Sequence, residues 1–136
     1  MSTDDRQTAE LPDLGEAERE ALHEAELGLE WLRRAHGALL EFHHGTGHAM
    51  DHLARAESLF REAGRTELAD ALRDEHLPRG VIDGGRWSYD VVETFEEGLM
   101  EPLTGFERAA REQVADGQRH VTERRQERRW KRRARD

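Results

Sequence analysis

The 136-residue sequence contains no cysteine, which excludes disulfide bonds and thiolate chemistry. It also has no run of about 18 consecutive apolar residues, so it offers no transmembrane helix. The first ten residues lack the basic and apolar regions of a secretory signal peptide. We therefore expect a cytoplasmic protein.

The sequence motifs of common enzyme classes are missing as well. No serine or cysteine nucleophile lies near a histidine, and there is no phosphate-binding glycine loop and no dinucleotide fingerprint. An enzymatic function therefore has little support, and the sequence identifies no catalytic residue.

Lysine is almost absent, since Lys131 is the only lysine among 21 basic residues, which stand against 30 acidic ones. A net charge of −9 suits a protein of a salty cytoplasm, but it assigns no function. The charge is divided unevenly along the chain. Residues 111 to 136 hold ten basic and five acidic residues, whereas residues 1 to 110 hold 11 basic and 25 acidic residues.

A long helical repeat is present between residues 16 and 63. Its members recur at alternating three- and four-residue steps, the heptad pattern of a helix that packs against a partner. They are Leu22, Ala25, Leu29, Leu32, His36, Leu39, His43, Thr46, Met50, Leu53 and Phe60. The repeat keeps its phase through the Gly-Thr-Gly segment at residues 45 to 47. We therefore predict one helix from about Leu14 to Ala63, ended by Gly64, rather than two helices separated by a turn.

Two more helical segments follow this repeat. Residues 66 to 76 form a predicted short amphipathic helix, and Pro78 ends it. Residues 77 to 90 carry turn signals and predict a loop. From Tyr89 onwards an apolar pattern of eleven-residue period continues towards Arg133, with Pro102 as a point of kinking or interruption.

These segments predict an all-α fold in which two long antiparallel helices form a hairpin, with a short connecting helix. Residues 1 to 12 are expected to be disordered, and residues 13 to 136 to form a single helical domain. The basic C-terminal end would then lie beside the acidic start of the first helix. Apolar residues outside the heptad positions predict that a second copy completes a helical bundle as a homodimer. These residues are Trp31, Leu40, Phe42 and Leu59.

A cluster of histidines and carboxylates between residues 41 and 52 is a candidate metal site. At 100° per residue its members share one side of the helix, opposite the heptad positions. They are Glu41, His44, His48, Asp51 and His52. Such a set can approach a divalent transition metal such as zinc, iron or manganese, and Glu-x-x-His is the spacing of carboxylate-bridged diiron bundles. The alternative is a polar helix face on which histidines bond to neighbouring carboxylates.

A metal-binding bundle needs ligands from several helices, and matching residues elsewhere are few. Glu20 and His23 repeat the Glu-x-x-His spacing, but on the same helix about 30 Å away. In the last helix, His120 stands three residues before Glu123 without a second close pair. The likeness to hemerythrin-type metal bundles therefore covers only one helix.

His36 and His43 occupy heptad positions where a helix pair would have leucine, and they predict a buried polar pair. Polar residues at such positions fix the register and the number of partners. The alternative is a protonation-sensitive or metal site, formed with a second copy or with Glu107 and Glu112 of the last helix.

The loop is a further candidate site, a pocket for an anion or a small ligand. Its residues are His76, Arg79, Arg86, Trp87 and Tyr89. The alternative is that Trp87 packs with Val81 and Ile82 to close the end of the hairpin.

The arginine-rich C-terminal segment, with Trp130 available for stacking, predicts nucleic-acid binding as a third function. Glu123 and Glu127 oppose this interpretation because they alternate with the arginines as helical charge pairs do. The acidic N-terminal half would also repel phosphates.

Three segments carry a resemblance to a known family: HHGTGHAMDH (residues 43 to 52), DEHLPRG (74 to 80) and RWSYD (86 to 90). They resemble a family of small acidic helical proteins from salt-adapted microbes, over residues 30 to 130. The resemblance implies no activity, cofactor or catalytic residue. The sequence thus favours a structural or interaction protein, with a metal-binding bundle as the alternative.

Overall fold

A computed structural model describes residues 15 to 135 of the chain. Over these residues the fold is all-α, as predicted, and the one β contact is an isolated bridge between Ile82 and Arg86. The elements are α2 (Glu16–Glu62), α3 (Thr66–Ala71), the π-helical turn η1 (Leu72–His76), α4 (Ser88–Phe95), the π-helical turn η2 (Glu96–Met100), α5 (Glu101–Ala115) and α6 (Val121–Arg133). The predicted disorder of residues 1 to 12 and the predicted helix start near Leu14 lie outside the described residues.

The contacts group the chain into two compact units. Of the described residues, unit 1 contains 15 to 32 together with 101 to 135, and unit 2 contains 33 to 100. The single helical domain over residues 13 to 136 stays a prediction. No helix of the described residues combines the length and the apolar character that crossing a membrane requires.

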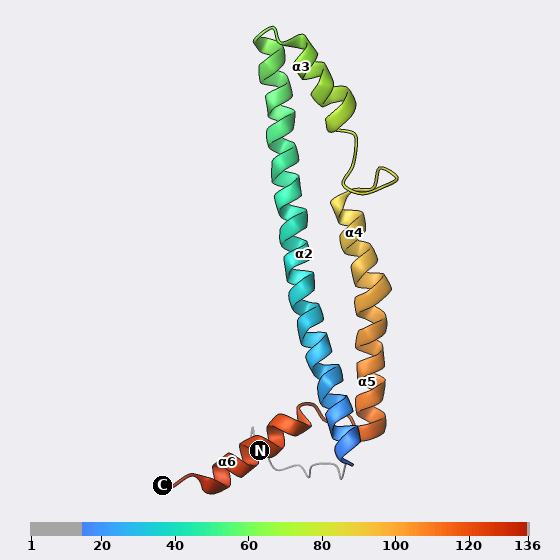
Figure 1. Ribbon diagram of the computed structural model, residues 1–136, viewed down its shortest axis with the longest axis vertical. Coiled ribbons are helices and arrows are strands. Elements are labelled where there is room, and N and C mark those ends of the chain that lie inside the picture. Colours follow the sequence, from blue (N-terminus) through green and yellow to red (C-terminus); the bar gives the residue numbers. More distant parts are fainter. Residues whose placement is uncertain (1–14, 136) are drawn as a thin grey trace, which may run out of the picture. The chain divides into compact units, whose positions relative to one another are not determined.

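The long helix α2 continues without a break through residues 45 to 47, which confirms the prediction of one helix (Figure 1). It ends where Gly64 adopts a left-handed φ of 79°. The Gly64 N–H donates to the Arg61 carbonyl at 3.1 Å, and the Arg65 N–H donates to the Phe60 carbonyl at 2.8 Å. This is the Schellman arrangement, which satisfies carbonyls that the helix leaves without a partner.

In unit 2, α2 lies against α4 and η2 in the antiparallel sense. His36 Nε2 is 2.7 Å from Glu96 Oε2, and His43 Nδ1 is 2.7 Å from Ser88 Oγ. The residue numbers rise along α2 while those of the partners fall, so the two segments run in opposite directions. Ser88 is buried at this contact.

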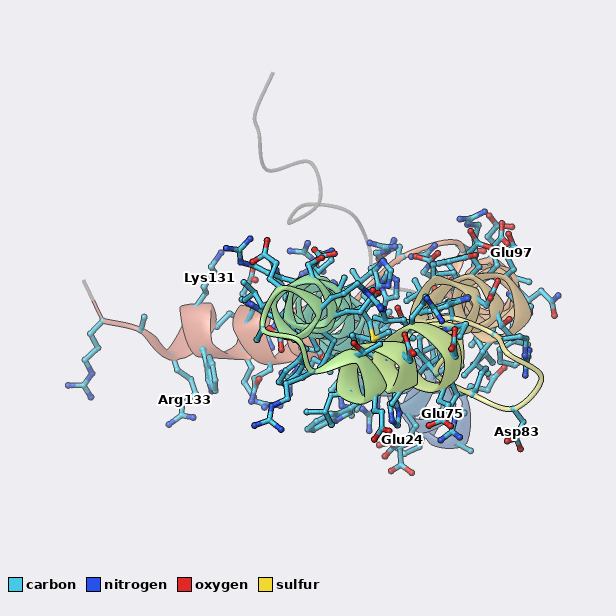
Figure 2. All side chains as sticks on the ribbon, turned by 90° about the horizontal axis from the view of Figure 1, so that it is seen from above. Glu24, Glu75, Asp83, Glu97, Lys131 and Arg133 are labelled. Carbon is cyan, nitrogen blue, oxygen red and sulfur yellow. The ribbon has the colours of Figure 1, made fainter. Side chains whose placement is uncertain are left out.

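The short helix predicted over residues 66 to 76 is present as α3 followed by η1. Ala69 of α3 is buried, and Asp70 accepts a hydrogen bond at 3.0 Å from Arg61 near the end of α2. The acidic side chains of Glu75 and Asp83 point outwards from unit 2 and are exposed (Figure 2).

The loop between η1 and α4 closes on itself. The Val81 N–H donates to the Arg86 carbonyl at 2.7 Å. Gly80 has a φ of 84°, and a Cβ atom there would lie 2.7 Å from the carbonyl carbon of Gly85. Only glycine fits this close approach of backbone to backbone.

In unit 1, the first part of α2 packs against α5 and α6. Leu22, Ala115 and Val121 form a buried apolar cluster, and Ala110 packs against it. The cluster therefore joins one residue from each of α2 and α6 to the end of α5.

The prediction of a second long helix is wrong at residues 116 to 120, where the chain is not helical. The apolar pattern predicts a helix running on towards Arg133, but α5 ends at Ala115 and α6 begins at Val121. Asp116, Gly117 and His120 adopt left-handed φ values of 51°, 80° and 57°. An Asp-Gly pair is a turn signal, and here it outweighs the apolar period.

The interruption predicted at Pro102 takes the form of η2, the π-helical turn immediately before α5. Proline has no N–H, and its ring crowds the carbonyl one turn earlier. A widened turn ahead of Pro102 accommodates both effects.

Candidate metal centre

Two His-x-x-Glu pairs face each other in unit 1. His23 and Glu26 lie on α2, while His120 and Glu123 lie at the start of α6. A spacing of three residues puts His23 and Glu26 on one face of α2, while His120 is the left-handed residue immediately before α6. The left-handed turn at His120 starts a new helix direction, and the first turn of α6 meets α2 there.

The contacts between the two pairs are crossed. His23 Nδ1 is 3.2 Å from Glu123 Oε1. The His120 backbone N–H donates to Glu26 Oε1 at 3.1 Å, and His120 Nδ1 lies 3.9 Å from Glu26 Oε2. Each histidine thus meets the glutamate of the other helix.

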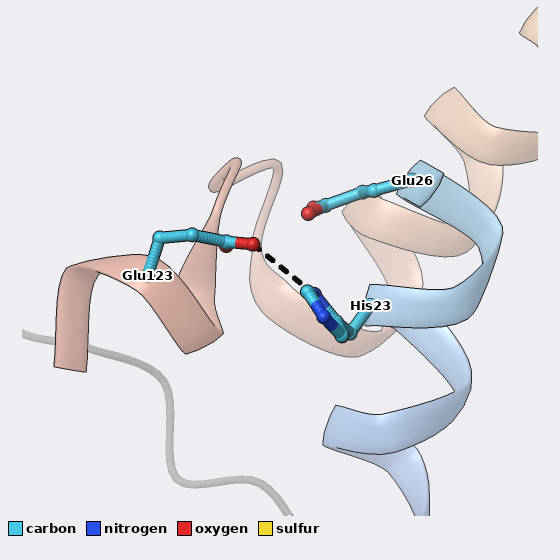
Figure 3. Close-up of side chains that lie close together, drawn as sticks. All are labelled: His23, Glu26 and Glu123. Atoms are coloured by element: carbon cyan, nitrogen blue, oxygen red, sulfur yellow. Dashed lines mark ion pairs between the residues drawn. The ribbon is translucent and has the colours of Figure 1, made fainter. Parts of the chain in front are cut away.

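His23, Glu26 and Glu123 converge on one point, as Figure 3 shows. Each offers one ligand atom, and these atoms all lie within 4.8 Å of one another. No other group of three histidines and carboxylates meets this condition in the part of the chain that the structure describes.

Glu26 is the most buried of the three side chains. Glu26 has only 10% of its side-chain surface exposed. Burial raises the pKa of the Glu26 carboxyl, and the charges of Glu123 and Glu107 raise it further, although the His120 N–H lowers it. His23 Nδ1 is buried and has no hydrogen-bond partner. The site therefore brings carboxylates together with an imidazole nitrogen that no hydrogen bond satisfies.

A charged pair on α5 lies close to the site, since the charge of Glu107 raises the pKa of Glu26. Arg111 and Glu107 on α5 are both buried, and Arg111 Nε lies 3.9 Å from Glu107 Oε1. Arg111 thus offsets the charge of Glu107. On α2, Arg19 donates to Thr122 Oγ1 at 2.8 Å and so anchors the first turn of α6 beside the site.

The structure places the predicted metal cluster elsewhere, on α2 in unit 2. All five of its residues are exposed, and no three of their ligand atoms come within 4.8 Å of one another. They are Glu41, His44, His48, Asp51 and His52. Metal binding at this cluster stays a prediction.

His36 and His43 are half-buried and contact different residues. His36 pairs with Glu96 and stacks on Phe95, with ring centroids 6.1 Å apart and planes 5° apart. His43 pairs with Ser88. The partners thus come from η2 and α4 of the same chain, where the sequence suggested Glu107, Glu112 or a second copy.

The residues of the predicted loop pocket surround the loop in unit 2. Trp87 is half-buried, and the other four are exposed. They are His76, Arg79, Arg86 and Tyr89. Ligand binding at this loop stays a prediction.

In α6, Glu127 lies 3.1 Å from Lys131 and 3.8 Å from Arg124. These contacts confirm the predicted helical charge pairs for Glu127, whereas Glu123 contacts His23 of α2. Trp130 is exposed.

From the sequence, His23 was paired with Glu20, and His120 was noted three residues before Glu123, but Glu26 was missed as a site residue. The signal was the repetition of His-x-x-Glu once near each end of the chain. The prediction of one helix running through residue 120 hid it, because only a break there lets the first turn of α6 meet α2.

No protein family, curated protein or solved structure matches this chain. Membership of the family of small acidic helical proteins stays a prediction. The chemistry of the site therefore has to be inferred from its own residues.

Proposed function

We propose that this chain is a helical interaction protein that pairs with a second copy through one stripe of α2. The observation that carries this proposal is the exposure of Phe42, Leu53 and Phe60, at 43%, 39% and 38%. At 100° per residue these side chains lie within about 20° of one another around the helix. Large apolar side chains aligned along an exposed helix face are typical of a helix–helix interface.

Small residues occupy the rest of this α2 stripe. Within about 40° of Phe42 lie four alanines, three of them exposed and one half-buried. They are Ala35, Ala38, Ala49 and Ala56. Large side chains that alternate with small ones allow two facing helices to interdigitate.

The spacing of residues along the stripe is similar in both directions along α2, which favours a second copy as the binding partner. Ala49 follows Phe42 by seven residues, and Phe60 follows Leu53 by seven. In an antiparallel pair with its two-fold axis at residue 51, Phe42 faces Phe60 of the second copy, and Ala49 faces Leu53. A two-fold interface needs this self-complementarity.

Of the four apolar residues predicted to meet a second copy, Leu40 lies off the stripe, about 160° from Phe42 around α2, and so does Leu59, about 100° from Phe60. Leu59 is 48% exposed. Leu59 therefore provides a matched control, since it is as large and as accessible as Leu53 but faces a different direction.

Each copy, in this proposal, is a cytoplasmic helical hairpin. The antiparallel contacts of His36 and His43 with η2 and α4 support this arrangement in unit 2. In unit 1, the packing of Leu22 of α2 against Ala115 at the end of α5 supports a returning helix beside α2.

Sedimentation velocity over a range of protein concentrations tests the proposal. The natural chain should sediment as a dimer, the Leu53→Arg variant as a monomer with unchanged helical circular dichroism, and the Leu59→Arg variant as a dimer. An arginine at residue 53 would place two like charges inside the interface, which costs several kcal/mol. A monomeric natural chain, or equal effects of the two substitutions, would contradict the proposal.

A further inference from the structure

We propose that His23, Glu26 and Glu123 together bind one divalent first-row transition-metal ion. The site lies wholly within unit 1 and does not depend on pairing through α2. It is also distinct from the histidine cluster of residues 41 to 52.

The spacing of the donor atoms suits such an ion. A zinc ion with ligand bonds of 2.0 to 2.2 Å in tetrahedral geometry holds neighbouring ligand atoms about 3.4 Å apart. His23 Nδ1 and Glu123 Oε1 are already 3.2 Å apart, and the third ligand atom, from Glu26, lies within 4.8 Å of both. Small rotations of the glutamate side chains would complete the geometry.

The state of His23 is a second observation that points to a ligand. Its Nδ1 is buried without a hydrogen bond, although a carboxylate oxygen lies 3.2 Å away. Buried polar atoms nearly always have a partner, so an unsatisfied one needs an explanation. A metal ion at the convergence point would accept the lone pair of the neutral imidazole and satisfy this nitrogen.

Glu26 is prepared for the same role. Its Oε1 accepts the His120 N–H, which holds the carboxylate in place and leaves Oε2 for an ion. A hydrogen bond of this kind to a ligating group orients it and strengthens binding. The half-exposed side chain of His120 offers a further ligand atom at the edge of the site, because its Nδ1 lies 3.9 Å from Glu26 Oε2.

The charge of the site also favours a cation. Glu26 and Glu123 bring two carboxylates together, and the nearby cation Arg111 pairs with Glu107. A divalent ion would neutralise both carboxylates. One imidazole and two carboxylates are ligands that zinc, iron and manganese share, and zinc binds such sets more tightly than manganese or ferrous iron.

Titration calorimetry with zinc on the full chain, after removal of metal by a chelator, tests the proposal. The natural chain should bind one equivalent and unfold at a higher temperature with zinc, because a ligand that binds the folded state stabilises it. The variants Glu26→Gln and Glu123→Gln keep the shape of the side chain and should bind zinc more than about 100-fold more weakly, beyond the loss of an outer contact.

A triple variant with His44, His48 and His52 replaced by alanine is the matched control. It should bind zinc as the natural chain does. Circular dichroism of each variant shows that weaker binding does not come from unfolding, and visible absorption with cobalt reports a change in the metal's ligands. A natural chain that binds no zinc, glutamine variants that bind it normally, or a triple variant that loses binding would each overturn the proposal.

Discussion

Glu26 carries a carboxylate at a place with little water, and this has a consequence for stability that is separate from metal binding. A carboxyl whose pKa is raised in the folded state destabilises that state once it ionises. The stability that the protonated Glu26 carboxyl contributes is fully present below the ordinary glutamate pKa. It is lost as the pH rises through the higher pKa that this carboxyl has in the folded state.

We therefore predict that Glu26→Gln stabilises the metal-free chain at neutral pH. Glutamine keeps an oxygen that accepts the His120 N–H but carries no charge. In the presence of a chelator, the variant should unfold at a higher temperature than the natural chain at pH 7. The difference should shrink towards about pH 4, where the natural carboxyl is protonated. A variant that is less stable than the natural chain at pH 7 would contradict this prediction. It would show that favourable contacts of the ionised carboxylate outweigh the cost of burying its charge.

Sequence reasoning succeeded with single residues when the cause was local. Gly64 was identifiable as the end of α2 because a left-handed residue after a helix is usually glycine. The burial of Glu26 was not identifiable, because nothing in its immediate neighbours marks it as buried. Its burial depends on α6, which lies far away along the chain.

At the scale of elements, the continuity of α2 was predictable but the direction of its faces was not. A heptad repeat drifts by about 20° per seven residues relative to a straight helix. From Leu32 to Phe60 the drift adds up to about 80°. The last residues of the repeat therefore no longer lie on the side of α2 that packs against α4 and η2. Leu53 and Phe60 belong to the heptad pattern and are nevertheless exposed.

Between α5 and α6, by contrast, the predicted continuity of the helix was wrong. Val114 and Val121 continue an apolar period through Gly117, and that period favoured one helix. The Asp-Gly turn signal at residue 116 was the competing evidence. Its left-handed backbone decided the position of α6 and, with it, the candidate metal centre.

The end of α2 allows a paired test with the same substitution at two glycines. Gly64→Ala should lower the free energy of unfolding by about 1–2 kcal/mol, because alanine is strained at a φ of 79°. Gly37→Ala, in the interior of α2, should raise it by up to about 1 kcal/mol. A Cβ atom at either position meets nothing within 4 Å, so packing does not interfere.

Urea unfolding followed by circular dichroism measures both effects. The signs should differ between the two variants. A loss of stability in the Gly37→Ala variant would mean that this part of α2 is not a regular helix in solution.

For the whole molecule, the prediction concerns the orientation of two copies in a dimer. The chain has no cysteine, so a Gly37→Cys variant carries one spin label at a single known position. In the antiparallel pair centred on residue 51, the two labels are separated by about 42 Å along the helix axis, from the rise of 1.5 Å per residue. In a parallel pair, helices 8–10 Å apart would bring the labels within roughly 25 Å.

Pulsed electron spin resonance on the labelled dimer distinguishes the two orientations. A short distance would rule out the two-fold axis at residue 51 while leaving the α2 stripe as an interface. The Leu53→Arg substitution in the same labelled chain should remove the distance altogether.

The crossed pairs of histidine and glutamate have a bearing on how the protein is made. Glu123 leaves the ribosome long after His23 and Glu26, so a growing chain has only two of the three ligands until α6 has been synthesised. Metal uptake at this site would therefore come late, after all of α2 has been synthesised, and it would join α6 to α2 at the last stage of chain growth.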